Sequence, residues 1–154
     1  MKKTIAILLA VCLCIGLCAC SVKSEQEPAS KAIGLNKDNI SQYLGYKIGK
    51  PVRKSSTSEY SIVTIEFYSL QGGSFGNTVV TLSFSDMYPD YIEEITGAEL
   101  QSKDEYPRDG TITFTLPSDG RYEIDLEVWD WYGMGTVDFN LEFQNASGTF
   151  TPIS

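Results

Sequence analysis

Two tryptophans two positions apart, Trp129 and Trp131, are the residues whose type and spacing most directly suggest a binding chemistry. They belong to the run EVWDWYGMG, residues 127–135. In a β-strand, side chains two positions apart share a face and lie about 7 Å apart. That spacing suits stacking against successive sugar rings. We therefore predict a ligand-binding surface formed by Trp129, Trp131 and Tyr132, with a glycan or cell-wall polymer as its ligand.

The strand that must position these indoles shows a period of two in its apolar side chains. If the apolar set points into a core, alternation places both tryptophans on the opposite face, beside Asp125 and Glu127. Three alternatives stay open: one ring caps the open end of the core, a bulge near Asp130 turns a ring inward, or residues 86–109 cover the outer face. The set expected to point inward is Tyr122, Ile124, Leu126 and Val128.

Most catalytic chemistry is excluded by composition. The chain has no histidine, which removes the usual acid–base group at neutral pH and the commonest transition-metal ligand. Lys103 is the only lysine after Lys54, and nothing around it suggests a base. The acidic runs at 86–94 and 104–109 lack the D-x-D-x-D-G spacing of a calcium loop. We expect no enzyme activity, no cofactor and no metal, with a carboxylate-based hydrolase as the weakest alternative.

A second candidate surface lies at two expected hairpin tips. The linker QGGSFGN carries Phe75, and the turn YGMG carries Tyr132 and Met134. If both tips meet at one end of the domain, these side chains form an exposed apolar spot, which is typical of protein contacts. The alternative function is therefore an accessory subunit that contacts a partner protein through Phe75, Tyr132 and Met134.

The N-terminal segment indicates where the protein is located. Lys2 and Lys3 precede an uncharged apolar run that is short for a membrane-spanning helix, so residues 1–19 are predicted to be a signal peptide. Its end, Leu17-Cys18-Ala19-Cys20, resembles the lipobox of bacterial lipoproteins. The resemblance implies a diacylglycerol on Cys20 and a location on the extracytoplasmic face of the membrane. The alternatives are an ordinary secretory signal cut near Ala19, which leaves Cys20 as a free thiol, and an uncleaved anchor.

Lipidation at Cys20 would leave the mature chain without a disulfide, because the other three cysteines precede it. Residues 20–34 are polar and are expected to be a flexible tether, and residues 35–154 one domain large enough to bury a core. Charge divides the chain: residues 20–54 hold seven basic and three acidic side chains, a balance of +4. From residue 55 onward three basic residues oppose seventeen carboxylates, a balance of −14. Nucleic acid is therefore not an expected partner.

The rest of the chain is predicted to form mainly β-strands. Alternating apolar residues occur in 58–69, 78–85, 111–116, 122–129 and 137–143, and the first two of these runs are expected to form a hairpin across QGGSFGN. A single helical turn is expected after Asn36, a short helix or irregular strand between Tyr91 and Ile95, and a last strand near Gly148. Short strands with almost no helix favour an all-β, antiparallel two-sheet sandwich.

Two copies of a P-x-D-G turn, at residues 107–110 and 117–120, flank the strand 111–116, and each glycine is expected to supply a positive φ. The stretch TFTLPSDGRYEIDLEV resembles the corner of immunoglobulin-like and fibronectin-type-III-like sandwiches. That resemblance implies an immunoglobulin-like domain in which Tyr122 is the corner tyrosine. A jelly roll is the alternative fold.

Overall fold

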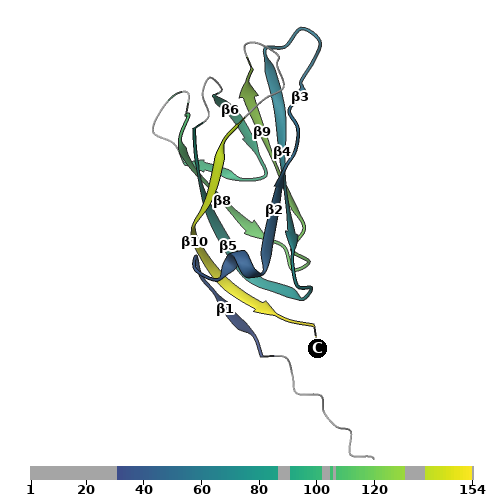
Figure 1. Ribbon diagram of the computed structural model, residues 1–154, viewed down its shortest axis with the longest axis vertical. Coiled ribbons are helices and arrows are strands. Elements are labelled where there is room, and N and C mark those ends of the chain that lie inside the picture. The colour runs from purple at the N-terminus through teal and green to yellow at the C-terminus, as the bar shows by residue number, and fades with distance from the viewer. Residues whose placement is uncertain (1–30, 87–90, 102–104, 106, 131–137, 154) are drawn as a thin grey trace, which may run out of the picture.

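The computed structural model describes residues 31–86, 91–101, 105, 107–130 and 138–153 as an all-β domain (Figure 1). Two antiparallel five-stranded sheets pack against each other, so the sandwich predicted from the sequence is confirmed. We call sheet A the one with strand order β1-β10-β5-β8-β7, and sheet B the one with order β2-β4-β9-β6, in which β3 also pairs with β4. Sheet A contains β1 (Ile33–Leu35), β5 (Ser74–Ser85), β7 (Glu99–Gln101), β8 (Gly110–Leu116) and β10 (Asn140–Thr151). Sheet B contains β2 (Leu44–Ile48), β3 (Val52–Arg53), β4 (Tyr60–Ser69), β6 (Ile92–Thr96) and β9 (Tyr122–Trp129).

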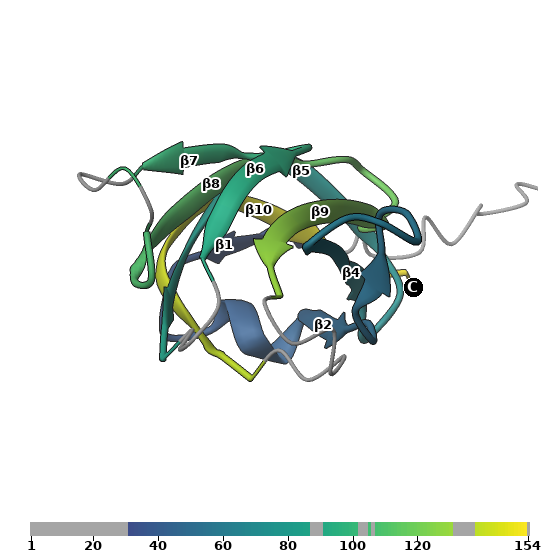
Figure 2. The same cartoon turned by 90° about the horizontal axis from the view of Figure 1, so that it is seen from above.

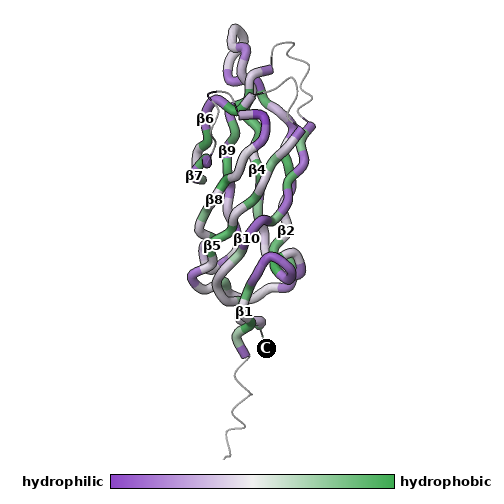
Figure 3. The backbone as a smooth tube through the Cα atoms, turned by 90° about the vertical axis from the view of Figure 1, so that its left-hand side faces the viewer, coloured by the Kyte–Doolittle hydropathy of each residue, from purple (hydrophilic) through white to green (hydrophobic). Residues whose placement is uncertain are grey.

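The core lies between the two sheets and follows the alternation of the sequence. In β4 the buried positions Val63, Ile65 and Phe67 alternate with partly or fully exposed ones, and in β9 Ile124, Leu126 and Val128 are buried. Figure 3 shows the same alternation of hydrophobic and hydrophilic positions along the strands. Each such side chain contributes about 1.5–3 kcal/mol when it is fully removed from water. The predicted helical turn is a single 3-10 turn, η1 (Ile40–Gln42), and it buries Ile40.

The order of the strands differs from the one expected from neighbouring segments. β4 and β5 were expected to pair as a hairpin, and the segment after β9 was expected to pair with it. Instead β4 and β9 lie in sheet B, whereas β5 and β10 lie in sheet A. The chain crosses between sheets at both connections, which gives β1-β10-β5-β8 opposite β4-β9-β6. This interleaving is that of a jelly roll, the alternative fold.

The domain is elongated, and its two ends differ. Figure 1 shows β1 and the C terminus at one end, which we call the proximal end, and β3 with the last residues of β9 at the other, the distal end. At the proximal end Ile33 pairs with Phe150, which pairs in turn with Phe75. At the distal end Tyr60 pairs with Trp129. The ten residues of β4 alone cover about 30 Å between these ends.

Figure 2, viewed along the long axis, shows the strands around one central core, with β6 and β7 close together where the two sheets meet. These two strands come from residues 86–109, where the sequence left a short helix or an irregular strand open between Tyr91 and Ile95, and the structure has a strand there. β6 pairs with β9 at the edge of sheet B, with a bulge between Ile92 and Glu94. Tyr91, the residue directly before β6, is thereby brought to the distal end beside Trp129.

The two P-x-D-G copies adopt different structures. Gly120 has φ +66° and its N–H donates to the carbonyl of Pro117, as expected. Gly110 is the first residue of β8 and is not among the residues with positive φ, so the same expectation is wrong for the first copy. The reason is that Gly110 pairs with Phe84 in the sheet, which requires extended backbone.

Tyr122 also departs from the corner that the sequence resembles. Its hydroxyl donates to the carbonyl of Gly97, between β6 and β7, instead of to the loop that precedes it. The ring stacks on Phe114 with centroids 5.4 Å apart. Tyr122 therefore links β9 to the β6–β7 turn and to β8 of the other sheet.

Candidate functional site

Trp129 lies on the outer face of sheet B, the face predicted from alternation. It is the last residue of β9, follows the buried Val128, and is half-buried. The next residue, Asp130, is 6 % exposed, and Ser61 Oγ donates to its Oδ2 at 3.3 Å. Alternation therefore continues through Asp130, and no bulge turns Trp129 inward.

Two neighbours hold the indole in position. Its Nε1 donates to Oε2 of Glu59 at 3.3 Å, and its ring packs against Tyr91 with centroids 5.7 Å apart and planes tilted by 35°. The backbone N–H of Trp129 also donates to the carbonyl of Tyr91 at 2.8 Å. Tyr91, from the segment 86–109, thus lies against the tryptophan and supplies a second aromatic ring.

These residues enclose a cavity of about 440 Å³, which we call the distal aromatic pocket; its described lining residues are Glu59, Tyr60, Tyr91, Glu93 and Trp129. The volume is within the range of ordinary small-ligand pockets, about 300–1,000 Å³. Three aromatic rings and two carboxylates converge from three parts of the chain. Aromatic faces offer stacking surfaces, and carboxylate oxygens accept hydrogen bonds from hydroxyl or ammonium groups.

Sequence reasoning found Trp129 and missed the four other lining residues. Tyr60 fell within the predicted strand 58–69 and was given no binding role, Tyr91 and Glu93 fell where a short helix or an irregular strand was expected, and Glu59 was not considered. The only available signal was the mixture of aromatic and acidic residues in EYSIV and DYIEE. Nothing in those two runs indicates that they meet at the end of a strand that lies about seventy positions from the first run and about forty from the second.

An ion pair lies directly beside the pocket on the same face. Glu127 is 8 % exposed, and Nζ of Lys54 donates to both of its oxygens at 2.8 and 2.7 Å. This hydrogen bond raises the pKa of Lys54 above 10.5, and the negative charges of Glu127 and Glu94 raise it further. Glu94 is the cross-strand partner of Glu127 in the β6–β9 pair, and the positive charge of Lys54 offsets the repulsion between these two carboxylates.

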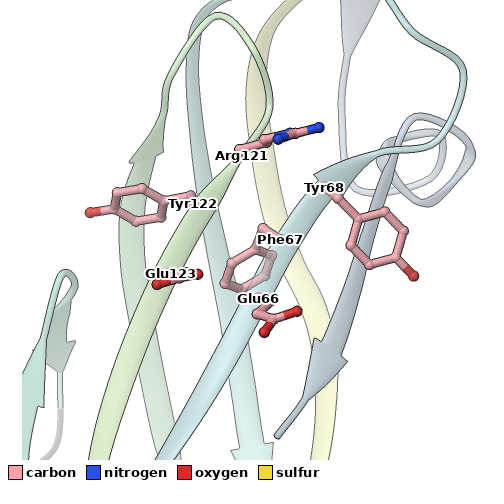
Figure 4. A pocket seen from close by; sticks show the side chains of 6 residues that line it. All are labelled: Glu66, Phe67, Tyr68, Arg121, Tyr122 and Glu123. Atoms are coloured by element: carbon pink, nitrogen blue, oxygen red, sulfur yellow. The ribbon is translucent and has the colours of Figure 1, made fainter.

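A second, larger hollow of about 620 Å³ lies at the proximal end of the same sheet (Figure 4). It is lined by Glu66, Phe67 and Tyr68 of β4 and by Arg121, Tyr122 and Glu123 of β9. Figure 4 shows Tyr122 pointing away from Tyr68, so these rings do not form a shared binding face. The ring of Tyr68 instead lies over Gly45, where an added Cβ would be 2.7 Å from its Cε2. This hollow offers no convergent aromatic pair.

The second predicted surface is not formed as expected. Phe75 was predicted to be exposed at a hairpin tip, and this is wrong: it is 2 % exposed and packs edge-on against Phe150 at 5.0 Å. The reason is that β5 begins at Ser74, so Phe75 is already a strand residue facing the core at the proximal end. Trp131, Tyr132, Met134 and Cys20 lie outside the described residues.

Two features are absent from the part of the chain that the structure describes. No group of three or more aspartate, glutamate, cysteine or histidine side chains there could hold a metal ion. In the same ranges no helix has the length and apolar character needed to cross a membrane.

A comparison of the chain with known protein families, curated proteins and solved structures gives no match. The class of the protein therefore comes from its own coordinates: a two-sheet β-sandwich with an aromatic and acidic pocket at one end.

Proposed function

We propose that this chain is a non-catalytic binding module that holds a glycan or cell-wall polymer in the distal aromatic pocket. The observation that carries the proposal is the convergence of Trp129, Tyr91 and Tyr60 around one cavity. Flat aromatic surfaces bind the apolar faces of sugar rings, and nearby carboxylates accept hydrogen bonds from hydroxyl groups. Fixed rings lose little conformational entropy on binding, and here Glu59 and Tyr91 already hold the indole.

The proposal includes the lipid anchor on Cys20, which places the domain at the extracytoplasmic face of a bacterial membrane. The expected tether, residues 20–34, overlaps β1 at Ile33 and Gly34, and β1 lies at the proximal end. The pocket lies at the opposite end of β4, a strand about 30 Å long. A module tethered in this way presents its pocket away from the membrane, toward polymers of the cell envelope.

The alternative function, an accessory subunit that contacts a partner protein, loses one of its three residues. Phe75 belongs to the core at the proximal end, so it is not available as an exposed contact residue. Among the described residues Val52 of β3, at the distal end, is exposed, and a single exposed apolar side chain is normal and does not form a contact patch. The glycan pocket is therefore the function that the geometry favours.

Tryptophan fluorescence tests the pocket. The chain has two tryptophans, so Trp131→Phe leaves Trp129 as the only reporter. We expect oligosaccharides of the cell envelope to change the emission of this variant, and Trp129→Ala in the otherwise unchanged chain to weaken binding at least tenfold in calorimetry. Tyr68→Ala, which removes an exposed ring at the proximal end, is the matched control and is expected to bind normally. Equal binding by Trp129→Ala and the unchanged chain would contradict the proposal.

The anchor is tested separately. Metabolic labelling with a radioactive fatty acid is expected to mark the protein when Cys20 is present and not in Cys20→Ser. Membrane fractionation should show the unchanged chain in the membrane and the variant released. Persistent membrane association of an unlabelled Cys20→Ser chain would instead indicate an uncleaved anchor.

A further inference from the structure

We infer that the ligand of the distal aromatic pocket is a cationic glycan, a hexosamine polymer whose amino groups are not acetylated. This inference rests on the proposed function and names the chemical class of the ligand of that same site. It depends on the charges around the cavity, on the faces of the aromatic rings, and on the pairing of the nearest lysine.

The first observation is the charge of the lining. Of the five described residues around the cavity, two are carboxylates, Glu59 and Glu93, and none is basic. Both carboxylates are exposed, so they retain access to solvent and to a ligand. Glu59 uses one oxygen to accept the hydrogen bond from the indole, and a carboxylate has further lone pairs for a second donor.

The second observation concerns the nearest cation. Three basic side chains belong to this end of sheet B or its neighbouring loop, Arg53, Lys54 and Arg108, and none is among the described lining residues. Both oxygens of Glu127 already accept hydrogen bonds from Lys54. That pair satisfies Glu127, which is nearly buried, and the charge of Lys54 also acts on Glu94, so Glu59 and Glu93 are the charged groups of the described lining. Two negative charges without a positive one disfavour acidic polymers and attract cations.

The third observation is the aromatic wall. The faces of tryptophan and tyrosine rings attract cations held within about 6 Å, and this attraction grows as water is excluded. Trp129 and Tyr91 pack 5.7 Å apart and Tyr60 completes the described lining, so a ligand in the cavity meets aromatic side chains and carboxylates together. A hexosamine with a free amino group fits both, because its ring stacks on an indole and its ammonium donates hydrogen bonds to carboxylates.

Acetylation of the amine removes its positive charge, and with it both the attraction to the aromatic rings and the charge-assisted hydrogen bonds to the carboxylates. An N-acetylated sugar of the same backbone keeps the stacking face but has a neutral amide. The contrast between a glucosamine tetramer and an N-acetylglucosamine tetramer therefore separates the charge of the ligand from its ring stacking. At about pH 6 an ordinary amine is protonated and an ordinary carboxylate is ionised, so the contrast is best measured there.

The test is calorimetric titration of the full chain in detergent with both tetramers, at low and at high salt. We expect the glucosamine tetramer to bind at least tenfold more tightly than the acetylated one, and the difference to shrink with salt. Glu93→Gln is expected to weaken binding of the glucosamine tetramer about tenfold, the factor typical of one charge-assisted hydrogen bond. Glu59→Gln should weaken it less, because a glutamine oxygen still accepts from the indole.

Glu142→Gln is the matched control, since Glu142 is an exposed glutamate on β10 of sheet A and its loss changes the net charge by the same amount. If this variant weakens binding as much as Glu93→Gln does, the effect is one of overall charge and the inference is wrong. If both tetramers bind equally and Trp129→Ala abolishes the binding of both, the proposed function stands and the cationic ligand is rejected. If neither tetramer binds, the inference is rejected, and the panel of other envelope oligosaccharides then decides the proposed function.

Discussion

The tightest turn of the proximal end gives a prediction whose size follows from the coordinates. Gly120 has φ +66°, where a residue with a Cβ costs about 1–2 kcal/mol. A Cβ at this position would lie 2.6 Å from Cε2 of Phe75 and 3.2 Å from Cβ of Ser69. Because Phe75 is 2 % exposed, its ring has no free space to move into, and overpacking of this kind costs about 1–3 kcal/mol.

Gly120→Ala should therefore lower the free energy of unfolding by about 1–4.5 kcal/mol, after about 0.4–1 kcal/mol is regained because alanine restricts the unfolded chain. For a domain of this size the midpoint of thermal unfolding should fall by roughly 10 °C. Chemical denaturation followed by circular dichroism measures the free energy, and a thermal scan measures the midpoint. The loss is large against a typical total of about 5–15 kcal/mol.

Two other glycines serve as controls for this prediction. Gly110 occupies the same place in the first P-x-D-G copy without a positive φ, and its added Cβ would lie 2.8 Å from Cζ of Phe84. Gly110→Ala should cost about 1–3 kcal/mol from overpacking alone. Gly34 is exposed with nothing within 4 Å of an added Cβ, so Gly34→Ala should be neutral or slightly stabilising. Equal stability of the Gly120 and Gly34 variants would refute the reasoning.

Three further perturbations have defined outcomes. Glu127 raises the pKa of Lys54, so the stability that this pair contributes is present at neutral pH and is lost as the pH rises through that raised pKa, above 10.5. Lys54→Met should therefore abolish the loss of stability at alkaline pH. Lys47→Met, the control, should retain it. Phe150→Ala should lower the free energy of unfolding by about 3–5 kcal/mol in chemical denaturation, because the ring is fully buried. A loss below about 1 kcal/mol would contradict this and would show that neighbouring side chains fill the cavity. Gly148→Ala places a Cβ 2.5 Å from a backbone atom of β5 at φ +146°, so it should disrupt β10–β5 pairing and leave little soluble protein, and normal yield and stability would contradict this.

The strands and their buried faces were largely predictable from the sequence. Val63, Ile65 and Phe67 alternate with polar neighbours, and the structure buries this set. A period of two is a local property of extended backbone, so the sequence of each strand predicts which of its side chains face the core, whichever strand it pairs with. Prediction failed at Phe75, because two glycines beside it suggested a loop although the strand had already begun at Ser74.

Strand pairing was not predictable in the same way. Neighbouring strands pair in most folds, so a hairpin was the reasonable expectation for the segments on either side of QGGSFGN. In this domain the chain crosses between sheets there, and β4 pairs with β9, about sixty residues away. Such a choice depends on the packing of the whole core and on both sheets at once, and no short window of sequence contains it.

The candidate site shows the same division. The sequence by itself determined that Trp129 faces away from the core, that the chain after residue 55 is strongly acidic, and that histidine chemistry is absent. Only the tertiary structure decided that Glu59, Tyr91 and Glu93 surround that indole, and that Lys54 is paired with Glu127. The physical reason is that the direction of a side chain follows from the local backbone, whereas the residues that surround it are set by contacts between segments far apart in the chain.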